Sequence, residues 1–242
     1  MSLTTKLNTL FNRFFGYRIS TSHLYREMHT RRLMEKALQD NAVLFWDYND
    51  FSKRNVEIFS DYLKSNSVSS DRALGLEFGV AGGTTLNFVS GLLKDVRFWG
   101  FDSFEGFKDV KKSSIWFSYQ ERFTGQKLPE VNENVQLVKG YVEDTFPKFI
   151  SENASAAEVF YIHCDMDVYE PTRVVLNWVV ASDKKVFVLF DELLNYNEFH
   201  LHEYRAFLEA IIARNIPYRI HTLCDRGADI FGAYTKVFIE IR

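Results

Sequence analysis

Hydrophobic residues in the first seventy positions recur every three to four residues. Between positions 3 and 15 the apolar side chains are Leu3, Leu7, Leu10, Phe11, Phe14 and Phe15. This spacing places them on one side of a helix. The stretches 23–39 and 51–64 follow the same period, and a serine-rich segment at 65–71 ends the helical region. The sequence therefore predicts three helices here, over 3–15, 23–39 and 51–64.

From residue 73 onward, short apolar runs alternate with helical patterns. This alternation is typical of a parallel sheet with helices on both faces. Two final strands have no helix between them, so we expect an antiparallel hairpin at the sheet edge, with a loop at 224–232. The predicted fold is α/β, a Rossmann-like doubly wound sheet, mostly parallel, with a C-terminal hairpin and N-terminal helices. We expect strands at 73–78, 96–101, 135–138, 159–164, 185–190, 218–223 and 233–241, and helices at 84–93, 144–150, 171–180 and 202–214.

Composition narrows the class of protein. The 242 residues are 46% hydrophobic and 25% charged, which excludes a disordered or low-complexity chain. A net charge of -3 gives no general attraction to nucleic acid, so we expect no nucleic-acid partner. Cys164 and Cys224 lie in apolar runs without metal-ligand spacing, which favours a reducing, cytoplasmic location. The sequence has no run of eighteen apolar residues and no signal-like hydrophobic region.

A glycine-rich turn follows the first strand of the predicted sheet. Residues 77–85 read Glu-Phe-Gly-Val-Ala-Gly-Gly-Thr-Thr. Glycine lets a ligand approach the backbone, and the following helix offers free N–H donors. The spacing differs from the dinucleotide fingerprint G-x-G-x-x-G, and Glu77 would repel a diphosphate but attract an ammonium group. We therefore expect S-adenosylmethionine, held at its methionine end, and the alternative is an ordinary strand-to-helix turn. The expected contacts are Glu77, Gly79, Gly83 and Thr84.

Acidic and polar residues after the next two strands complete a nucleoside site. An acid about 20 residues beyond the glycine turn is where a ribose diol is held in such sheets, although it can also cap a helix. A nucleobase would lie after the third strand. Asp144 belongs either to this region or to the N-cap of the next helix. The expected contacts on the nucleoside are Asp102, Ser103, Tyr141, Val142 and Glu143.

Carboxylates gather at the ends of the fourth and fifth strands. Asp165 and Asp167 follow the fourth strand, and Asp191 and Glu192 end the fifth. Because the carboxyl ends of parallel strands meet at one edge, these four groups should converge. Like charges at close range require protonation or a bridging cation, and oxygen ligands favour Mg²⁺, Ca²⁺ or Mn²⁺. The sequence favours a metal site that includes Asp165 and Asp191, with helix caps or surface acids as the alternative.

A hydroxyl acceptor also needs a proton acceptor. A metal lowers the pKa of a hydroxyl, and Asp167 or a nearby histidine can then take the proton. His163 lies within a strand and is expected in the core. His200 and His202 precede a helix, where capping or solvent exposure is expected.

These features together resemble class I S-adenosylmethionine-dependent methyltransferases. Within that class the chain resembles the macrocin O-methyltransferase family, which methylates sugar hydroxyls of macrolides and related natural products. The similarity covers residues 76–207. Its specific motifs are Gly-Phe-Asp-Ser-Phe-Glu-Gly at 100–106 and Asp-x-Asp-x-Tyr at 165–169.

The resemblance implies roles for the acidic residues. Asp165, Asp191 and Glu192 would hold Mg²⁺, Asp165 would also contact the cofactor, and Asp167 would be the general base. The family usually has two Asp residues where this chain has Asp191-Glu192, so the metal site departs from its pattern. Val168 stands where catechol-type relatives carry Lys, which disfavours a catechol acceptor.

The sequence thus predicts a cytoplasmic, S-adenosylmethionine-dependent and Mg²⁺-dependent O-methyltransferase. Its acceptor would be a sugar hydroxyl of a glycoside, polysaccharide precursor or natural product. Residues 1–70 would form a helical lid and oligomerisation region of a homo-oligomer, and residues 71–242 the cofactor-binding domain. Residues 1–18 either contact a membrane surface or pack on a partner subunit. The rival functions are a metal-independent methyltransferase, an NAD-dependent oxidoreductase and a non-catalytic adenosine-binding protein.

Overall fold

The computed structural model describes residues 21–108, 110–112, 114–196, 198–229 and 232–241. The chain divides into two compact units, residues 1–36 and 37–242. In the first unit the described residues belong to helix α2 (Thr21–Gln39), which the sequence predicts at 23–39. The helix predicted at 3–15 lies outside the described residues, as do the proposed contacts of residues 1–18.

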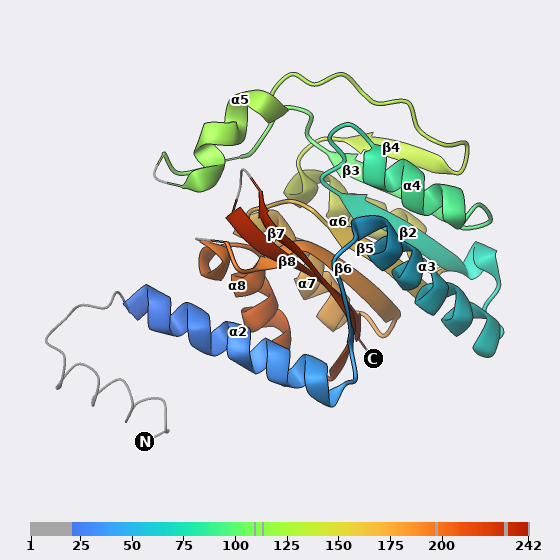
Figure 1. Ribbon diagram of the computed structural model, residues 1–242. Helices are drawn as coiled ribbons and strands as arrows, with labels where there is room; N and C mark the ends of the chain where they lie inside the picture. Colours follow the sequence, from blue (N-terminus) through green and yellow to red (C-terminus); the bar gives the residue numbers. More distant parts are fainter. Residues whose placement is uncertain (1–20, 109, 113, 197, 230–231, 242) are drawn as a thin grey trace, which may run out of the picture. The chain divides into compact units, whose positions relative to one another are not determined.

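The second unit contains an eight-stranded sheet with the order β1-β7-β8-β6-β5-β2-β3-β4 (Figure 1). Neighbouring strands are parallel except where β8 pairs with β6 and β7. The predicted Rossmann-like sheet, mostly parallel with an antiparallel C-terminal hairpin, is confirmed. The strands are β1 (Val43–Phe45), β2 (Ala73–Phe78), β3 (Arg97–Asp102), β4 (Val135–Lys139), β5 (Val159–Cys164), β6 (Lys185–Leu194), β7 (Tyr218–Asp229) and β8 (Gly232–Ile241).

The hairpin differs from the sequence prediction in two ways. It is not at the edge of the sheet, because β1 pairs in parallel with the outer side of β7. Its strands are also longer than predicted. The ladder runs from Tyr218 opposite Ile241 to Asp229 opposite Gly232, so most of the predicted loop at 224–232 is strand.

Helices cover both faces of the sheet (Figure 1). Helix α3 (Tyr48–Ser65) and helix α4 (Thr84–Leu92) lie on one face, and α6 (Val142–Asn153), α7 (Tyr169–Ala181) and α8 (Glu203–Phe207) lie on the other. Asp47 caps α3 by accepting the N–H of Asp50 at 3.0 Å. The α3 helix belongs to the second unit, although the sequence groups it with residues 1–70. Among the described residues, no helix is both long and apolar enough for a membrane crossing.

Shorter helical turns complete the unit. A π-helical turn, η4 (Leu208–Ile212), continues α8, so the predicted helix at 202–214 is divided. The segment between β3 and β4 holds η2 (Ile115–Tyr119) and α5 (Gln120–Phe123) instead of a long helix. The remaining turns are η1 (Ser70–Arg72) and η3 (Phe199–Leu201).

Aromatic residues fill the core on both faces of the sheet. The Phe59 ring of α3 packs edge-on against Tyr161 and Phe187, each with a centroid distance of 5.5 Å. On the other face, Trp178 of α7 packs against Phe160 at 4.9 Å. Tyr161 and Phe160 are neighbours on β5, and side chains of a strand alternate between faces. The same alternation decides which residues at the strand ends face α3.

Candidate functional site

A cavity of about 280 Å³ lies at the carboxyl edge of the parallel strands. The segments that follow β2, β3, β4 and β5, together with the last residues of β6, all contribute to its wall. Five strands therefore deliver side chains to one place, as the sequence predicts. The residues from these strand ends are Gly79 and Ala81; Asp102 and Ser103; Tyr141, Val142 and Glu143; Asp165, Met166 and Asp167; and Asp191 and Glu192.

Three of the predicted cofactor contacts do not line this cavity. Glu77 is 3% exposed on β2, and its carboxylate binds His163. Gly83 is the N-cap of α4, in the left-handed region with φ +75°. Thr84 begins α4. Of the predicted methionine-binding residues, Gly79 alone lies in the cavity wall.

Gly79 allows the ends of β2 and β5 to touch. Its φ is +89°, a backbone conformation that side chains disfavour. A Cβ atom here would lie 1.7 Å from the carbonyl oxygen of Asp165. Just before it, Phe78 accepts the N–H of Asp165 at 2.9 Å. Only glycine fits where the chain after β2 approaches the chain after β5 so closely. This approach brings the glycine turn next to the acidic cluster.

Asp102 braces the loops on either side of it. One carboxylate oxygen accepts the N–H groups of Val80 and Ala81, both at 2.8 Å, and the other accepts the N–H of Phe104 at 2.7 Å. A carboxylate has about four acceptor sites, and the described residues occupy three of them, which leaves one for a ligand hydroxyl. Asp102 therefore shapes the cavity wall as well as lining it.

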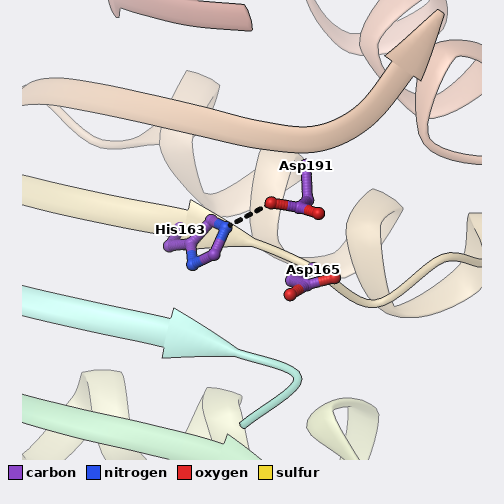
Figure 2. Close-up of side chains that lie close together, drawn as sticks. All are labelled: His163, Asp165 and Asp191. Atoms are coloured by element: carbon purple, nitrogen blue, oxygen red, sulfur yellow. Dashed lines mark hydrogen bonds and ion pairs between the residues drawn. The ribbon is translucent and has the colours of Figure 1, made fainter. Parts of the chain in front are cut away.

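Four buried ionisable residues form a row across the sheet, which we call the charged row: Glu77, His163, Asp191 and Lys236. His163 Nδ1 lies 3.0 Å from Glu77 Oε2, and His163 Nε2 lies 3.2 Å from Asp191 Oδ1. Figure 2 shows the His163–Asp191 contact, with Asp165 beside it. Lys236 Nζ forms an ion pair with the same Asp191 oxygen. All four side chains are on the α3 face of the sheet, on strands β2, β5, β6 and β8.

Opposite charges stabilise this row in spite of its burial. Burial lowers the pKa of His163, but its hydrogen bonds with Asp191 and Glu77 overcome that effect and raise the pKa well above its ordinary value. Burial likewise raises the pKa of Asp191, but Lys236 and His163 hold it well below the ordinary value. With an imidazolium at His163, both ring nitrogens donate to carboxylates. The row then alternates in charge across four strands.

A second group, the carboxylate trio, comprises Asp165, Asp167 and Glu192. Each offers an oxygen, and these atoms all lie within 4.8 Å of one another. Burial, and then the neighbouring carboxylates, raise the pKa of all three groups well above the ordinary value. Asp167 also has φ +63°, a strained conformation that is common at functional sites.

The trio fits a hard divalent cation, and a second group, His163, Asp165 and Asp191, also has its ligand atoms within 4.8 Å of one another. Glu192 Oε2 is buried and has no hydrogen-bond partner among the described residues. An unpartnered buried carboxylate oxygen is costly, and a cation would satisfy it. Asp191, by contrast, already has Lys236 and His163 as partners. Asp165 thus belongs to both groups, and Asp191 differs from Glu192 in having Lys236 and His163 as partners.

Glu203 lies at the base of this acidic region and is fully buried at the start of α8. Its Oε1 accepts the N–H of Met166 at 3.2 Å, while Oε2 has no hydrogen-bond partner among the described residues. Burial raises the pKa of Glu203 to about 8. At neutral pH the group is therefore mainly a neutral acid.

An aromatic wall closes the other side of the cavity. Phe107 lies 6.0 Å from Trp116 and 5.5 Å from Phe123, measured between ring centroids, and all three line the cavity. Glu198 ties this segment to the end of the sheet. Its Oε2 accepts the hydroxyl of Ser114 at 2.9 Å and the N–H of Ile115 at 3.2 Å. Contacts from outside the segment therefore support the wall, and they include the rings of Tyr196 and His202 against Trp116.

The histidines behave differently from the sequence expectation. His163 is buried, as expected of a core residue, but it carries the central contacts of the charged row. His202 stands at the N-cap of α8 without a side-chain capping bond, so the expected cap is absent. Its ring instead contacts Glu198 at 3.3 Å and stacks on Tyr196.

Sequence reasoning missed Lys236 and did not assign a role to Glu203. A lysine within a predicted edge strand indicates a solvated face, so nothing marked Lys236 as buried. Its two neighbours, Thr235 and Val237, are buried as well. The strand also contains Thr235 and Glu240, so its local pattern gave no signal of a buried lysine.

Distant structural neighbours of the chain are methyltransferases. No family model matches the sequence, and no curated protein matches it significantly. A precorrin-6y C5,15-methyltransferase from Geobacter metallireducens has a TM-score of 0.41 at 10% identity, over 77% of this chain and 86% of that one. The plantazolicin methyltransferase BpumL, in complex with a triazolic desmethylPZN analog and SAH, has a TM-score of 0.42 at 13% identity, over 80% of this chain and 84% of that one.

An O-methyltransferase family protein from Burkholderia thailandensis is also similar. Its TM-score is 0.39 at 11% identity, over 80% of this chain and 59% of that one. At these identities and TM-scores the likeness carries no argument about activity.

Proposed function

We propose that this chain is an S-adenosylmethionine-dependent O-methyltransferase that acts on a sugar hydroxyl with the help of a divalent cation. The observation that carries the proposal is one cavity that joins the glycine turn, the acid after β3, the turn before α6 and the carboxylate trio. In open α/β sheets, ligands bind beyond the carboxyl ends of the strands. A cavity with a nucleoside site at one end and carboxylates at the other suits methyl transfer to a hydroxyl with the help of a cation.

The cofactor would lie along the β2, β3 and β4 side of the cavity. Its methionine part would approach the backbone at Gly79, its ribose would use the open acceptor site of Asp102 and Ser103, and its base would lie against residues 141–143. Glu77 would not touch the cofactor, because its carboxylate is bound to His163 and does not line the cavity. The adenosine ligand is thus recognised by three loops that the sheet holds together.

The acceptor would lie between the aromatic wall and the carboxylate trio. Flat aromatic rings suit the apolar face of a sugar, and carboxylates bind its hydroxyls. Asp165 and Glu192 would hold Mg²⁺, which when bound lowers the pKa of a hydroxyl and orients its oxygen. Asp167, which lies beside them in the carboxylate trio, would take the proton. The remaining work of the protein is alignment and exclusion of water.

The first test is thermal unfolding with S-adenosylhomocysteine (SAH), with NAD as the control ligand. At about one hundred times its Kd, a ligand stabilises the folded protein by roughly 2.7 kcal/mol. For a chain of this size the midpoint should rise by about 5–10 °C. A rise with NAD and none with SAH would contradict the proposal.

A pair of variants locates the cofactor within the cavity. Glu143→Ala changes a residue of the cavity wall, and Glu152→Ala changes an exposed residue of the same helix. We expect the first to weaken SAH binding about tenfold and the second to leave it unchanged. Methyl transfer from labelled cofactor to glycosides, with and without EDTA, then tests the acceptor and the metal.

A further inference from the structure

Strand β8 carries a buried lysine where its pairing with β6 is irregular. Val237 pairs with Phe190, and Thr235 pairs with Leu194. Three residues of β6 therefore lie opposite a single residue of β8, Lys236. Bulges of this kind re-aim side chains and are common beside active sites.

The bulge places Lys236 against one of the predicted metal ligands. Lys236 is 2% exposed, and its Nζ forms an ion pair with Oδ1 of Asp191. The same oxygen lies 3.2 Å from His163 Nε2. The ring of Tyr48 covers the ammonium, with 4.8 Å between Nζ and the ring centroid. Lys236 and His163 thus converge on one oxygen, on the α3 face of the sheet and away from solvent.

This arrangement divides the four carboxylates of the edge into two kinds. Asp191 is held in the charged row, whereas Asp165, Asp167 and Glu192 face one another without a protein cation hydrogen-bonded to them in the described part of the chain. Lys236 and His163 both contact Oδ1 of Asp191, so a metal ion at this carboxylate would have to use Oδ2. Such an ion would lie close to the Lys236 ammonium, and two cations on one carboxylate repel each other.

We propose that Lys236 is a built-in cation that removes Asp191 from the metal-binding set. A divalent cation at this edge is then held by Asp165 and Glu192, beside Asp167, and the ammonium limits its affinity. Lys236 is a positioning residue in this account. The inference rests on one part of the proposed function, namely that this edge of the sheet binds a divalent cation.

Manganese binding tests the proposal directly. Free Mn²⁺ is measured by electron paramagnetic resonance during titration of the wild type, Lys236→Met and the double variant Asp191→Asn with Lys236→Met. Removing the ammonium frees Asp191, so Lys236→Met should bind Mn²⁺ at least about tenfold more tightly. The double variant lacks both partners and should stay within about threefold of the wild type.

Lys185→Met is the matched control, because Lys185 also pairs across β6 and β8, with Glu240, at the far end of β6. It should leave Mn²⁺ affinity unchanged. Three results would overturn the proposal. They are Mn²⁺ binding by a natively folded Lys236→Met that is no tighter than the wild type's, a similar gain in Lys185→Met, and no Mn²⁺ binding by any of the proteins.

If Lys236→Met does not fold, the double variant decides alone. A loss of more than about tenfold in it would make Asp191 a ligand and reject the inference. SAH binding, measured on the same samples, reports separately on the methyltransferase proposal.

Discussion

At the scale of single residues, the cavity depends on a glycine that no other residue can replace. Gly79→Ala should lower the free energy of unfolding by at least about 3 kcal/mol and abolish SAH binding, because a Cβ would meet the Asp165 carbonyl. Urea unfolding and SAH titration measure both effects. Gly82→Ala, in the same turn, has no atom within 4 Å of the new Cβ and should be nearly neutral. Equal losses in the two variants would refute this explanation.

The residues of the acidic edge divide into those that sequence can reveal and those that it cannot. Asp165, Asp167, Asp191 and Glu192 follow or end predicted strands, so strand order alone brings them together. Their division into a charged row and a trio depends on Lys236, which is 45 positions beyond Asp191 on a strand whose register contains a bulge. A local pattern carries no information about such a partner.

At the scale of elements, the segment between β3 and β4 is held by a contact from elsewhere. Glu198→Ala removes the acceptor for Ser114 and Ile115, so trypsin cleavage at Arg122 and Lys127 should become at least about threefold faster. Time courses followed by mass spectrometry measure the cleavage.

The matched control for this experiment is Glu121→Ala, an exposed acid within the same segment. Its cleavage rate should equal that of the wild type. If Glu198→Ala is cleaved no faster than Glu121→Ala, the hydrogen bonds of Glu198 do not order the segment.

Element boundaries show where periodicity is informative. The strands at 73–78 and 159–164 match β2 and β5, because both are buried apolar runs between turns. β1 has only three residues, too few to show a hydrophobic period, so the sequence does not predict it. The hairpin strands continue past residue 223 because pairing between them, rather than apolar composition, extends them.

At the scale of the whole molecule, buried acids couple stability to pH. Folded Glu203 keeps its proton up to about pH 8, whereas the unfolded chain releases it near its ordinary value of 4.5. Between these values the folded state binds more protons, so the free energy of unfolding falls as pH rises. Glu203→Gln should make this slope shallower by up to about 1.4 kcal/mol per pH unit.

Urea unfolding at pH 5 to 8 in EDTA measures the slope. Gln keeps the acceptor for the Met166 N–H, so the variant tests the charge rather than the hydrogen bond. Glu152→Gln, on an exposed face, should follow the wild type. Parallel curves for Glu203→Gln and the wild type would show that Glu203 does not hold the extra proton.

The place of β8 in the sheet has a consequence for how the chain is synthesised. It is the last described strand along the chain, yet it lies between β6 and β7 instead of at an edge. During translation the sheet therefore stays divided until residues 232–241 emerge, and β6 and β7 present open edges to other chains. Lys236 arrives with that strand, so Asp191 has no lysine counter-ion until then. Closure of the sheet and completion of the charged row are thus a single late event in folding.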